Sequence, residues 1–262
     1  MIPEYAINQW RSYVPWNSMP QVEQDLIISR SLIELFNDAY LSSHLAFRGG
    51  TALHKLYLNP QVRYSEDLDL VQIYAEPIKE TIEHIRDTLS FLGVPVIKQK
   101  ANNNTLVFRM ESEFAPVVPI RLKVEMNCRE HFSVLGLTHS SFSVDNSWYS
   151  GSAQITIYKL DELLGTKLRA LYQRKKGRDL FDLYHAITTA DVNVDNIISC
   201  YRKYMEFVVG AVPGKKEYLA NMEAKMLDPQ FLEDTKGLLL PEKHFDPVKA
   251  YEVIRSKVLV RL

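Results

Sequence analysis

The sequence predicts a mixed α/β domain followed by a helical domain, and three patterns carry this prediction. Apolar and polar residues alternate from Pro119 to Cys128, which is typical of a strand with one buried face. Shorter strand candidates and helical patterns precede it along the chain. After about residue 158 the strand patterns stop, and apolar residues recur at helical spacing. We therefore expect an α/β (α+β) domain over residues 1–158 and a helical domain over residues 159–262.

The first domain is expected to mix helices and strands. A long helix is predicted from Val22 to Leu45, after an N-terminal arm that contains prolines. The segment from Ala46 to Leu58 indicates a strand, a Gly49-Gly50 turn and a helix. The other expected elements are a helix at Pro77–Leu92 and strands at Leu68–Ile73, Val94–Ile97, Thr105–Met110, Pro119–Cys128 and Ile155–Tyr158.

Composition favours an ordinary globular protein. The chain has 262 residues, 46% of them hydrophobic, and its 31 Lys and Arg nearly balance 32 Asp and Glu. A formal net charge of −1 gives no global attraction to a polyanion, so any nucleic acid would have to bind a local basic patch.

Two further observations bear on localisation. The two cysteines, Cys128 and Cys200, lack a paired metal-binding spacing, which fits reduced thiols in the cytoplasm. No run of about 18 apolar residues occurs, so we expect neither a signal peptide nor a membrane span. These observations predict a cytoplasmic protein.

Three carboxylates are candidate metal ligands. In a strand, Asp67 and Asp69 share one face while Leu68 and Leu70 point into the core. Two like charges side by side repel each other, and a divalent cation would offset that repulsion. Glu125 could add a third oxygen ligand if its strand is a neighbour. The alternative is that the aspartates line a solvated sheet face.

A glycine pair precedes these acids in the sequence. Gly49 and Gly50 open a predicted helix, where backbone N–H groups can approach a phosphate at the positive helix end. On that helix Thr51 and Lys55 are expected to share the side away from the core, where both would help to bind the nucleotide. An ordinary tight turn and a solvated lysine are the alternatives.

The helical domain contributes further candidates. Lys167 lies within a stripe of leucines, so it either extends to the domain edge or enters a cleft to meet a triphosphate. Asp179 begins the next helix, where it could also simply favour the positive helix end. The basic run Arg174, Lys175, Lys176 and Arg178 is either a solvated loop or a site for phosphates.

Taken together, these segments resemble the AbiEii nucleotidyltransferase toxins, which include the MenT toxins. The matching order and spacing extend over residues 45–185. The segments that carry the resemblance are Phe47 to Leu53, Arg63 to Leu70, Leu160 to Leu171 and Arg178 to Tyr184.

The resemblance implies a polymerase-beta-like nucleotidyltransferase core with a mixed sheet, followed by a helical C-terminal domain. It implies that Asp67 and Asp69 bind Mg²⁺, with Glu125 at the third-acid position. Lys167 and Asp179 would complete the site. The residues implied to hold the triphosphate of a nucleoside triphosphate (NTP) are Gly50, Thr51 and Ser65.

The implied function is a Mg²⁺-dependent toxin that transfers a nucleoside monophosphate from an NTP to RNA, in particular to a tRNA 3′ end. A cognate antitoxin is implied as its partner. A local cluster formed by Lys167, Arg169 and the basic run could meet the RNA backbone. The alternatives are a protein or small-molecule acceptor, or a catalytically idle module that binds a nucleotide or an antitoxin.

Overall fold

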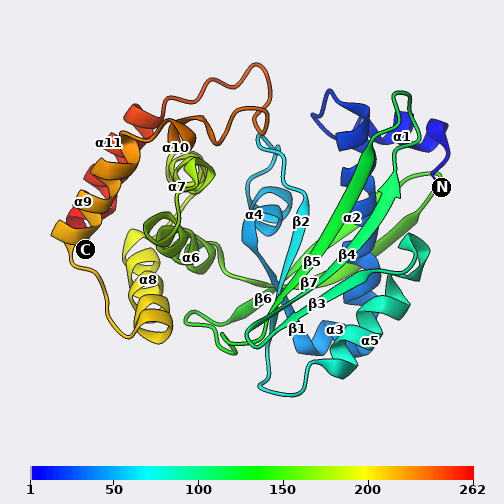
Figure 1. Cartoon of the computed structure of the whole chain (residues 1–262), viewed down its shortest axis with the longest axis horizontal. Coiled ribbons are helices and arrows are strands. Elements are labelled where there is room, and N and C mark those ends of the chain that lie inside the picture. Colours follow the sequence, from blue (N-terminus) through cyan, green and yellow to red (C-terminus); the bar gives the residue numbers. More distant parts are fainter. Residues whose placement is uncertain (1) are drawn as a thin grey trace. The chain divides into compact units, whose positions relative to one another are not determined.

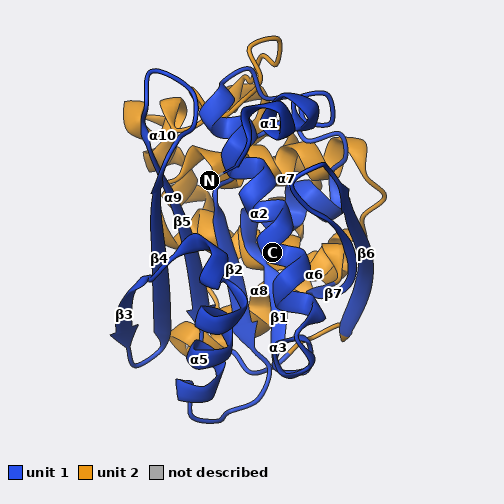
Figure 2. Ribbon diagram, turned by 90° about the vertical axis from the view of Figure 1, so that its right-hand side faces the viewer, with its two compact units in different colours: residues 1–132, 137–158 blue, residues 133–136, 159–262 orange. Residues whose placement is uncertain are grey.

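The computed structural model describes residues 2–262, which divide into two compact units (Figure 2). Unit 1 holds the chain up to residue 132 together with residues 137–158, and unit 2 holds residues 133–136 and 159–262. The short segment joins unit 2 because Ser133 and the backbone N–H groups of Val134 and Leu135 donate hydrogen bonds to the Glu162 carboxylate. The expected domain boundary at residue 158 takes no account of this segment.

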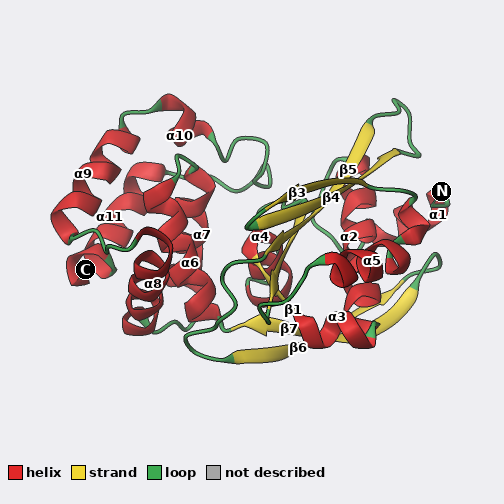
Figure 3. Ribbon diagram, turned by 60° about the horizontal axis from the view of Figure 1, so that its bottom comes forward, coloured by secondary structure: helices red, strands yellow, loops and turns green. Residues whose placement is uncertain are grey.

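Unit 1 is built around a mixed sheet (Figures 1 and 3). Within the described residues the sheet has seven strands in the order β3-β4-β5-β2-β1-β7-β6. The pairs β2/β5 and β1/β7 are parallel, and the other neighbouring pairs are antiparallel. The strands are β1 (Leu45–Arg48), β2 (Asp67–Gln72), β3 (Val96–Lys100), β4 (Asn103–Glu111), β5 (Pro119–Asn127), β6 (Leu137–Asp145) and β7 (Ser150–Tyr158). The predicted mixed α/β class is confirmed.

One face of this sheet forms the core of unit 1. Alternate residues of β5 are apolar and fully buried, namely Leu122, Val124 and Met126. Leu68 and Leu70 of β2 are also buried, with at most 1% of each residue exposed. Helix α2 (Met19–Asn37) packs against β5 and β7. Because alternate side chains point to opposite faces, burying one set leaves the polar set of β2 and β5 on the other face. That face carries the predicted acids.

Two groups of elements in unit 1 differ from the prediction, and the first is its helices. The expected helix at Val22–Leu45 is two helices, α2 and α3 (Ala39–His44), because Asp38 is extended and caps α3 by accepting a hydrogen bond from the Leu41 N–H. The N-terminal arm contains α1 (Glu4–Trp10). The remaining helices are α4 (Gly49–Ala52), a π-helix (Leu53–Tyr57), α5 (Lys79–Thr88) and a 3₁₀ turn (Ser90–Leu92).

The second difference concerns the strands at one edge of the sheet. Strand β6 was not predicted, and β7 begins at Ser150 rather than Ile155. Most residues of β6 are small or polar, so it lacks the apolar alternation by which a strand is recognised. It forms because its backbone pairs with β7 along the full length of both strands.

Unit 2 is helical, as expected. Its helices are α6 (Leu160–Gln173), α7 (Gly177–Thr189), α8 (Val194–Val209), α9 (Lys215–Met226), α10 (Pro229–Glu233) and α11 (Pro247–Lys257), followed by a 3₁₀ turn (Leu259–Arg261). Helices α6 and α8 approach closely at Gly165, where a Cβ would lie 2.5 Å from the Cβ of Cys200. Within residues 2–262 no helix is long and apolar enough to cross a membrane.

Candidate nucleotidyl-transfer site

The glycine turn between β1 and α4 is shaped by an aspartate. Gly49 has a φ of +86°, a conformation that L-residues with a side chain rarely adopt. A Cβ at this position would lie 2.0 Å from Oδ2 of Asp69, so the absence of a side chain lets the carboxylate pack directly against the turn. The glycine and the second aspartate of β2 therefore form one local structure, which was not apparent from the sequence.

Gly50 likewise leaves room for another side chain, that of Arg63. A Cβ there would lie 2.6 Å from Nη2 of Arg63 and 3.1 Å from Oγ of Ser65. The Arg63 guanidinium is buried, and it donates hydrogen bonds to Nε2 of His54 at 3.2 Å and to the Tyr64 carbonyl at 2.9 Å. These contacts hold the segment before β2 against the turn.

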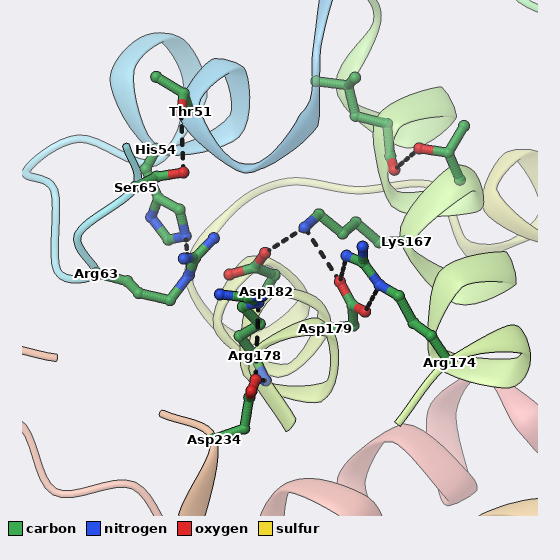
Figure 4. A network of polar contacts seen from close by, with 12 residues as sticks. Thr51, His54, Arg63, Ser65, Lys167, Arg174, Arg178, Asp179, Asp182 and Asp234 are labelled. Carbon is green, nitrogen blue, oxygen red and sulfur yellow. Dashed lines mark hydrogen bonds and ion pairs between the residues drawn. The ribbon is translucent and has the colours of Figure 1, made fainter. Parts of the chain in front are cut away.

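Thr51 and Ser65, both predicted to hold the triphosphate, are neighbours in the structure (Figure 4). Thr51 Oγ1 lies 2.9 Å from Ser65 Oγ and 2.5 Å from the carbonyl oxygen of Asp67. The Thr51 side chain thus ties α4 to the start of β2. Ser65 is half-buried, whereas Thr51 is buried.

The acids of β2 and β5 lie beside each other, as the prediction required. In the parallel register Asp69 is opposite Glu125, and Asp67 is opposite Lys123. Asp67 and Asp69 are half-buried on the polar face, between the buried Leu68 and Leu70. The predicted face of both aspartates and the neighbouring position of Glu125 are confirmed.

Lys123 is a cation within this group of acids that sequence reasoning did not single out. Its Nζ lies 3.4 Å from Oδ2 of Asp67 and forms an ion pair with Glu125. Burial lowers the pKa of Lys123, but the Glu125 and Asp67 carboxylates outweigh this effect and raise it overall. Its place on the polar face, two residues before Glu125, was the only signal in the sequence.

Asp67 is incompletely neutralised. Its Oδ1 is buried and has no hydrogen-bond partner among the described residues, although its side chain as a whole is 34% exposed. Burial raises the pKa of Asp67 above its usual value, an effect that Lys123 opposes and Glu125 reinforces. A carboxylate in this state would gain from a further cation.

Lys55 does not lie where the helical pattern placed it. The chain from Leu53 to Tyr57 is a π-helix, so the spacing assumed for an α-helix does not hold. Lys55 is buried, with Nζ 2.9 Å from Oδ2 of Asp25 and 3.0 Å from Oγ of Ser29, both on α2. The expectation that Thr51 and Lys55 share the side away from the core was wrong, because both side chains are buried.

Unit 2 holds the other predicted residues in a buried ion network (Figure 4). Lys167 on α6 reaches Asp182 at 2.7 Å and Asp179 at 3.2 Å, and both aspartates on α7 are fully buried. Arg174 donates to both oxygens of Asp179, at 2.7 and 2.8 Å. Burial raises the pKa of Asp179, but Lys167 and Arg174 outweigh it and lower the pKa overall. This network explains why a lysine interrupts the leucine stripe.

The basic run after α6 is also paired with acids. Lys175 lies 3.2 Å from Asp228, and Lys176 lies 3.4 Å from Asp234. Arg178 pairs with Asp234 as well, at 3.7 Å. The run therefore covers the loop between α6 and α7 and the first turn of α7, and its charges are largely balanced within unit 2.

Sequence reasoning gave no role to three residues of these networks. Arg63 stands in the segment quoted for the resemblance, and Asp182 follows Asp179 by about one helical turn. Asp25 is a lone acid in the predicted first helix, and only the fold brings it to Lys55. For Asp182, the i, i+3 spacing from Asp179 was the available signal.

Comparison with solved structures shows that other proteins share this fold. A candidate nucleotidyltransferase from H. pylori aligns with a TM-score of 0.53 and 17% identity, covering 94% of this chain and 99% of that one. MenT4, a nucleotidyltransferase toxin from Mycobacterium tuberculosis H37Rv, aligns with a TM-score of 0.52 and 14% identity, covering 97% and 99%. No curated protein matches the sequence.

The family is shown by the sequence itself. Residues 30–250 match the model of the AbiEii nucleotidyl transferase toxins of type IV toxin–antitoxin systems. The match spans most of both units, and the chain belongs to this family. Membership implies an NTP substrate and an antitoxin partner.

Proposed function

We propose that the protein is an active toxin that transfers a nucleoside monophosphate from an NTP to RNA, and that a tRNA 3′ end is the acceptor. The observation that carries this proposal is the packing of the Asp69 carboxylate against Gly49, with Asp67 on the same face of β2. This arrangement brings a backbone turn suited to phosphate and a pair of carboxylates suited to a cation into direct contact.

The residues present fit Mg²⁺. Carboxylate oxygens are the protein ligands that Mg²⁺ prefers, and it is usually held by one or two carboxylates together with substrate phosphates. The unpartnered, buried Oδ1 of Asp67 supplies such an oxygen. Among the described residues no group of three His, Cys, Asp or Glu is arranged around one point. Asp67 and Asp69 would therefore hold the ion, while Glu125 is engaged by Lys123 and its role as a third ligand stays a prediction.

In this proposal the protein acts mainly by positioning. The oxygen of an acceptor hydroxyl forms a bond to the α-phosphorus of the NTP. The bond between the α-phosphorus and the oxygen that bridges it to the β-phosphate breaks, so pyrophosphate leaves. The hydroxyl proton is lost to water. Bound Mg²⁺ would supply Lewis-acid stabilisation of the phosphate charge. The backbone N–H group of Gly50 and the hydroxyl of Ser65 would orient the triphosphate. The contact predicted for Thr51 stays a prediction, because its hydroxyl is buried against Asp67 and Ser65. The predicted phosphate contact of Lys167, and the part of Asp179 in it, stay predictions.

The test is transfer of label from each of the four α-³²P NTPs to total tRNA in the presence of Mg²⁺. Asp67→Ala serves as the inactive variant. Asp145→Asn, which removes an exposed carboxylate from β6, is the matched control. We expect labelled RNA from the wild type and Asp145→Asn and none from Asp67→Ala.

Each other outcome revises the proposal. Labelled RNA from Asp67→Ala would remove this aspartate from the mechanism. Absence of label with all four NTPs would redirect the search to a protein or small-molecule acceptor. If the wild type in addition binds no NTP, the idle module that binds only an antitoxin becomes the better description. Growth arrest on induction, relieved by Asp67→Ala, would show that the toxic effect depends on this site.

A further inference from the structure

The open face of the sheet in unit 1 carries a group of basic residues that extends outward from the acids. Lys98 and Lys100 lie on β3, Arg109 on β4 and Arg121 on β5, and all four are exposed. They line one hollow of about 270 Å³, which also includes Lys123 and Glu125. We call the four exposed residues, Lys98, Lys100, Arg109 and Arg121, the sheet-face cations.

The register places this group in line with the catalytic candidates. Lys98 is opposite Thr105, Thr105 is opposite Glu125, and Glu125 is opposite Asp69, so one row of residues crosses four strands. Three inter-strand spacings give this row a length of about 14 Å. Arg109 and Arg121 are directly opposite each other on the same face. The cations therefore lie beside the acids, on the same surface.

The sheet-face cations have no acid within ion-pair distance among the described residues, although Arg121 acts on Asp67 from further away and lowers its pKa. Within residues 2–262 none of their four side chains makes a hydrogen bond or an ion pair. Two cationic side chains directly opposite each other in a sheet repel, so Arg109 and Arg121 form an unfavourable pair unless an anion lies over them. In the basic run of unit 2, by contrast, Lys175 and Lys176 each have an acidic partner.

We propose that the sheet-face cations bind the phosphate backbone of the acceptor RNA strand and guide its end toward Asp67 and Asp69. Charge complementarity and the spread of four exposed cations over three strands favour a single-stranded polyanion over a compact ligand. The proposal rests on the proposed function, and it assigns RNA binding to unit 1 instead of to the loop of unit 2. Phosphate contacts of this kind position the strand without reading its sequence.

The test measures binding of the full-length protein to a fluorescent single-stranded RNA of about 12 nucleotides by anisotropy, at about 50 to 200 mM salt. Two double variants, Arg109→Gln with Arg121→Gln and Lys98→Gln with Lys100→Gln, each remove two positive charges. Lys175→Gln with Lys176→Gln removes two charges from the loop of unit 2 and is the matched control. Binding of each NTP is measured in parallel by calorimetry.

We expect each sheet-face double variant to weaken RNA binding about tenfold or more at the lowest salt. The slope of log affinity against log salt should fall by about 1.4 in each, because two phosphate contacts of a single strand are lost. The control should bind RNA as the wild type does, and NTP binding should be unchanged in all of them.

Three results would overturn the proposal. In the first, the sheet-face variants bind RNA with unchanged affinity and an unchanged salt slope. An acidic protein would then be the better candidate for the partner of these cations. In the second, the control loses as much as they do. In the third, the wild type binds no RNA. NTP binding tests the proposed function separately, because a wild type that binds NTP but not RNA keeps the nucleotide site and loses only the acceptor assignment.

Discussion

The protein contains two pairs of aspartates, Asp67 and Asp69 on strand β2 and Asp179 and Asp182 on helix α7, and Asp67 and Asp179 lie in opposite electrostatic environments. In unit 1, the Asp67 side chain is 34% exposed and shares the cation Lys123 with Glu125. In unit 2, Asp179 and Asp182 are fully buried and are neutralised by Lys167 and Arg174. Accordingly the pKa of Asp67 is raised, chiefly by burial, whereas the cations around Asp179 lower its pKa.

The difference teaches how the same residue type comes to serve binding or structure. A buried carboxylate with two cationic partners is already satisfied, and removing one member leaves an uncompensated charge. An under-neutralised carboxylate at the edge of solvent keeps its affinity for a divalent cation. On this view Asp67 and Asp69 act in chemistry, and Asp179 and Asp182 fix the position of Lys167.

The largest expected effect is the loss of transfer when the first pair is changed. Asp69→Asn should lower the rate of nucleotide transfer by about 10⁴-fold, which is about 5.4 kcal/mol of transition-state stabilisation. The free energy of unfolding should change little, because this carboxylate is only half-buried. Single-turnover kinetics measure the transfer rate, and urea unfolding measures the stability. If Asp69→Asn lost much stability but its folded fraction retained transfer, Asp69 would have a structural role instead of a chemical one.

The second pair should show the converse. Asp179→Ala should reduce the free energy of unfolding by about 3 to 5 kcal/mol, because Lys167 and Arg174 lose a buried partner. The control is Glu233→Ala, which breaks an exposed ion pair with Lys236 and should cost less than about 1 kcal/mol. Urea unfolding followed by circular dichroism compares them, and equal costs would show that the buried network adds no stability.

A matched pair of glycines sharpens the account of the turn. Gly49 and Gly93 have nearly the same φ, +86° and +85°. Atoms of Asp69 lie within 4 Å of the position that a Cβ would take at Gly49, whereas at Gly93 no atom of the described residues beyond its chain neighbours lies within 4 Å of that position. Gly93→Ala should cost about 1 to 3 kcal/mol from backbone strain alone, because its φ of +85° and ψ of −160° fall in a region essentially confined to glycine. Gly49→Ala should cost more than this and should also abolish transfer, since Asp69 must move. Retained transfer by Gly49→Ala would show that the contact between turn and carboxylate is not required.

The smallest expected effect is a shift in pH dependence. The raised pKa of Asp67 means that its carboxylate is protonated at a higher pH than an ordinary aspartate. The stabilising effect of ionised Asp179 is complete above its unfolded pKa of about 3.9, and it is lost only as pH falls through the lower folded value. On acidification, transfer should therefore decline before these ion pairs break.

Lys123→Met tests whether the ionisation of Asp67 sets the acid limb of the pH–rate profile. Lys123 lowers the pKa of Asp67, so its removal should move the acid limb of the pH–rate profile to higher pH. The profile is measured at saturating NTP for the wild type and the variant. An acid limb that stays in place or moves to lower pH would show that Asp67 does not set it.

Much of the fold was predictable from the sequence. The alternation in β5 and β2 placed Asp67, Asp69 and Glu125 on one face because burial of the intervening apolar residues leaves no other arrangement. Strand β6 was missed because backbone pairing, not apolar patterning, holds it. Lys55 was misplaced because a π-helix shifts the positions of side chains and because its partner Asp25 is 30 residues away.

The site was predictable only in part, for a related reason. Spacing identifies which residues share a face, but it does not say which charges already have partners. The sequence showed the basic run at residues 174–178 as a dense cluster, and the fold supplies it with Asp228 and Asp234. The sheet-face cations are scattered over three strands in the sequence and gather only when those strands pair.

The central claim is that Asp67 and Asp69 of β2 bind a divalent cation together with the nucleotide, and that the unpartnered Oδ1 of Asp67 is one of its ligands. Calorimetric titration of Mn²⁺ into the protein with a non-hydrolysable NTP analogue tests this most directly, with Asp67→Asn and the control Asp145→Asn alongside. The account predicts binding by the wild type and the control, with binding lost in Asp67→Asn. Equal Mn²⁺ affinity for all three proteins would contradict it.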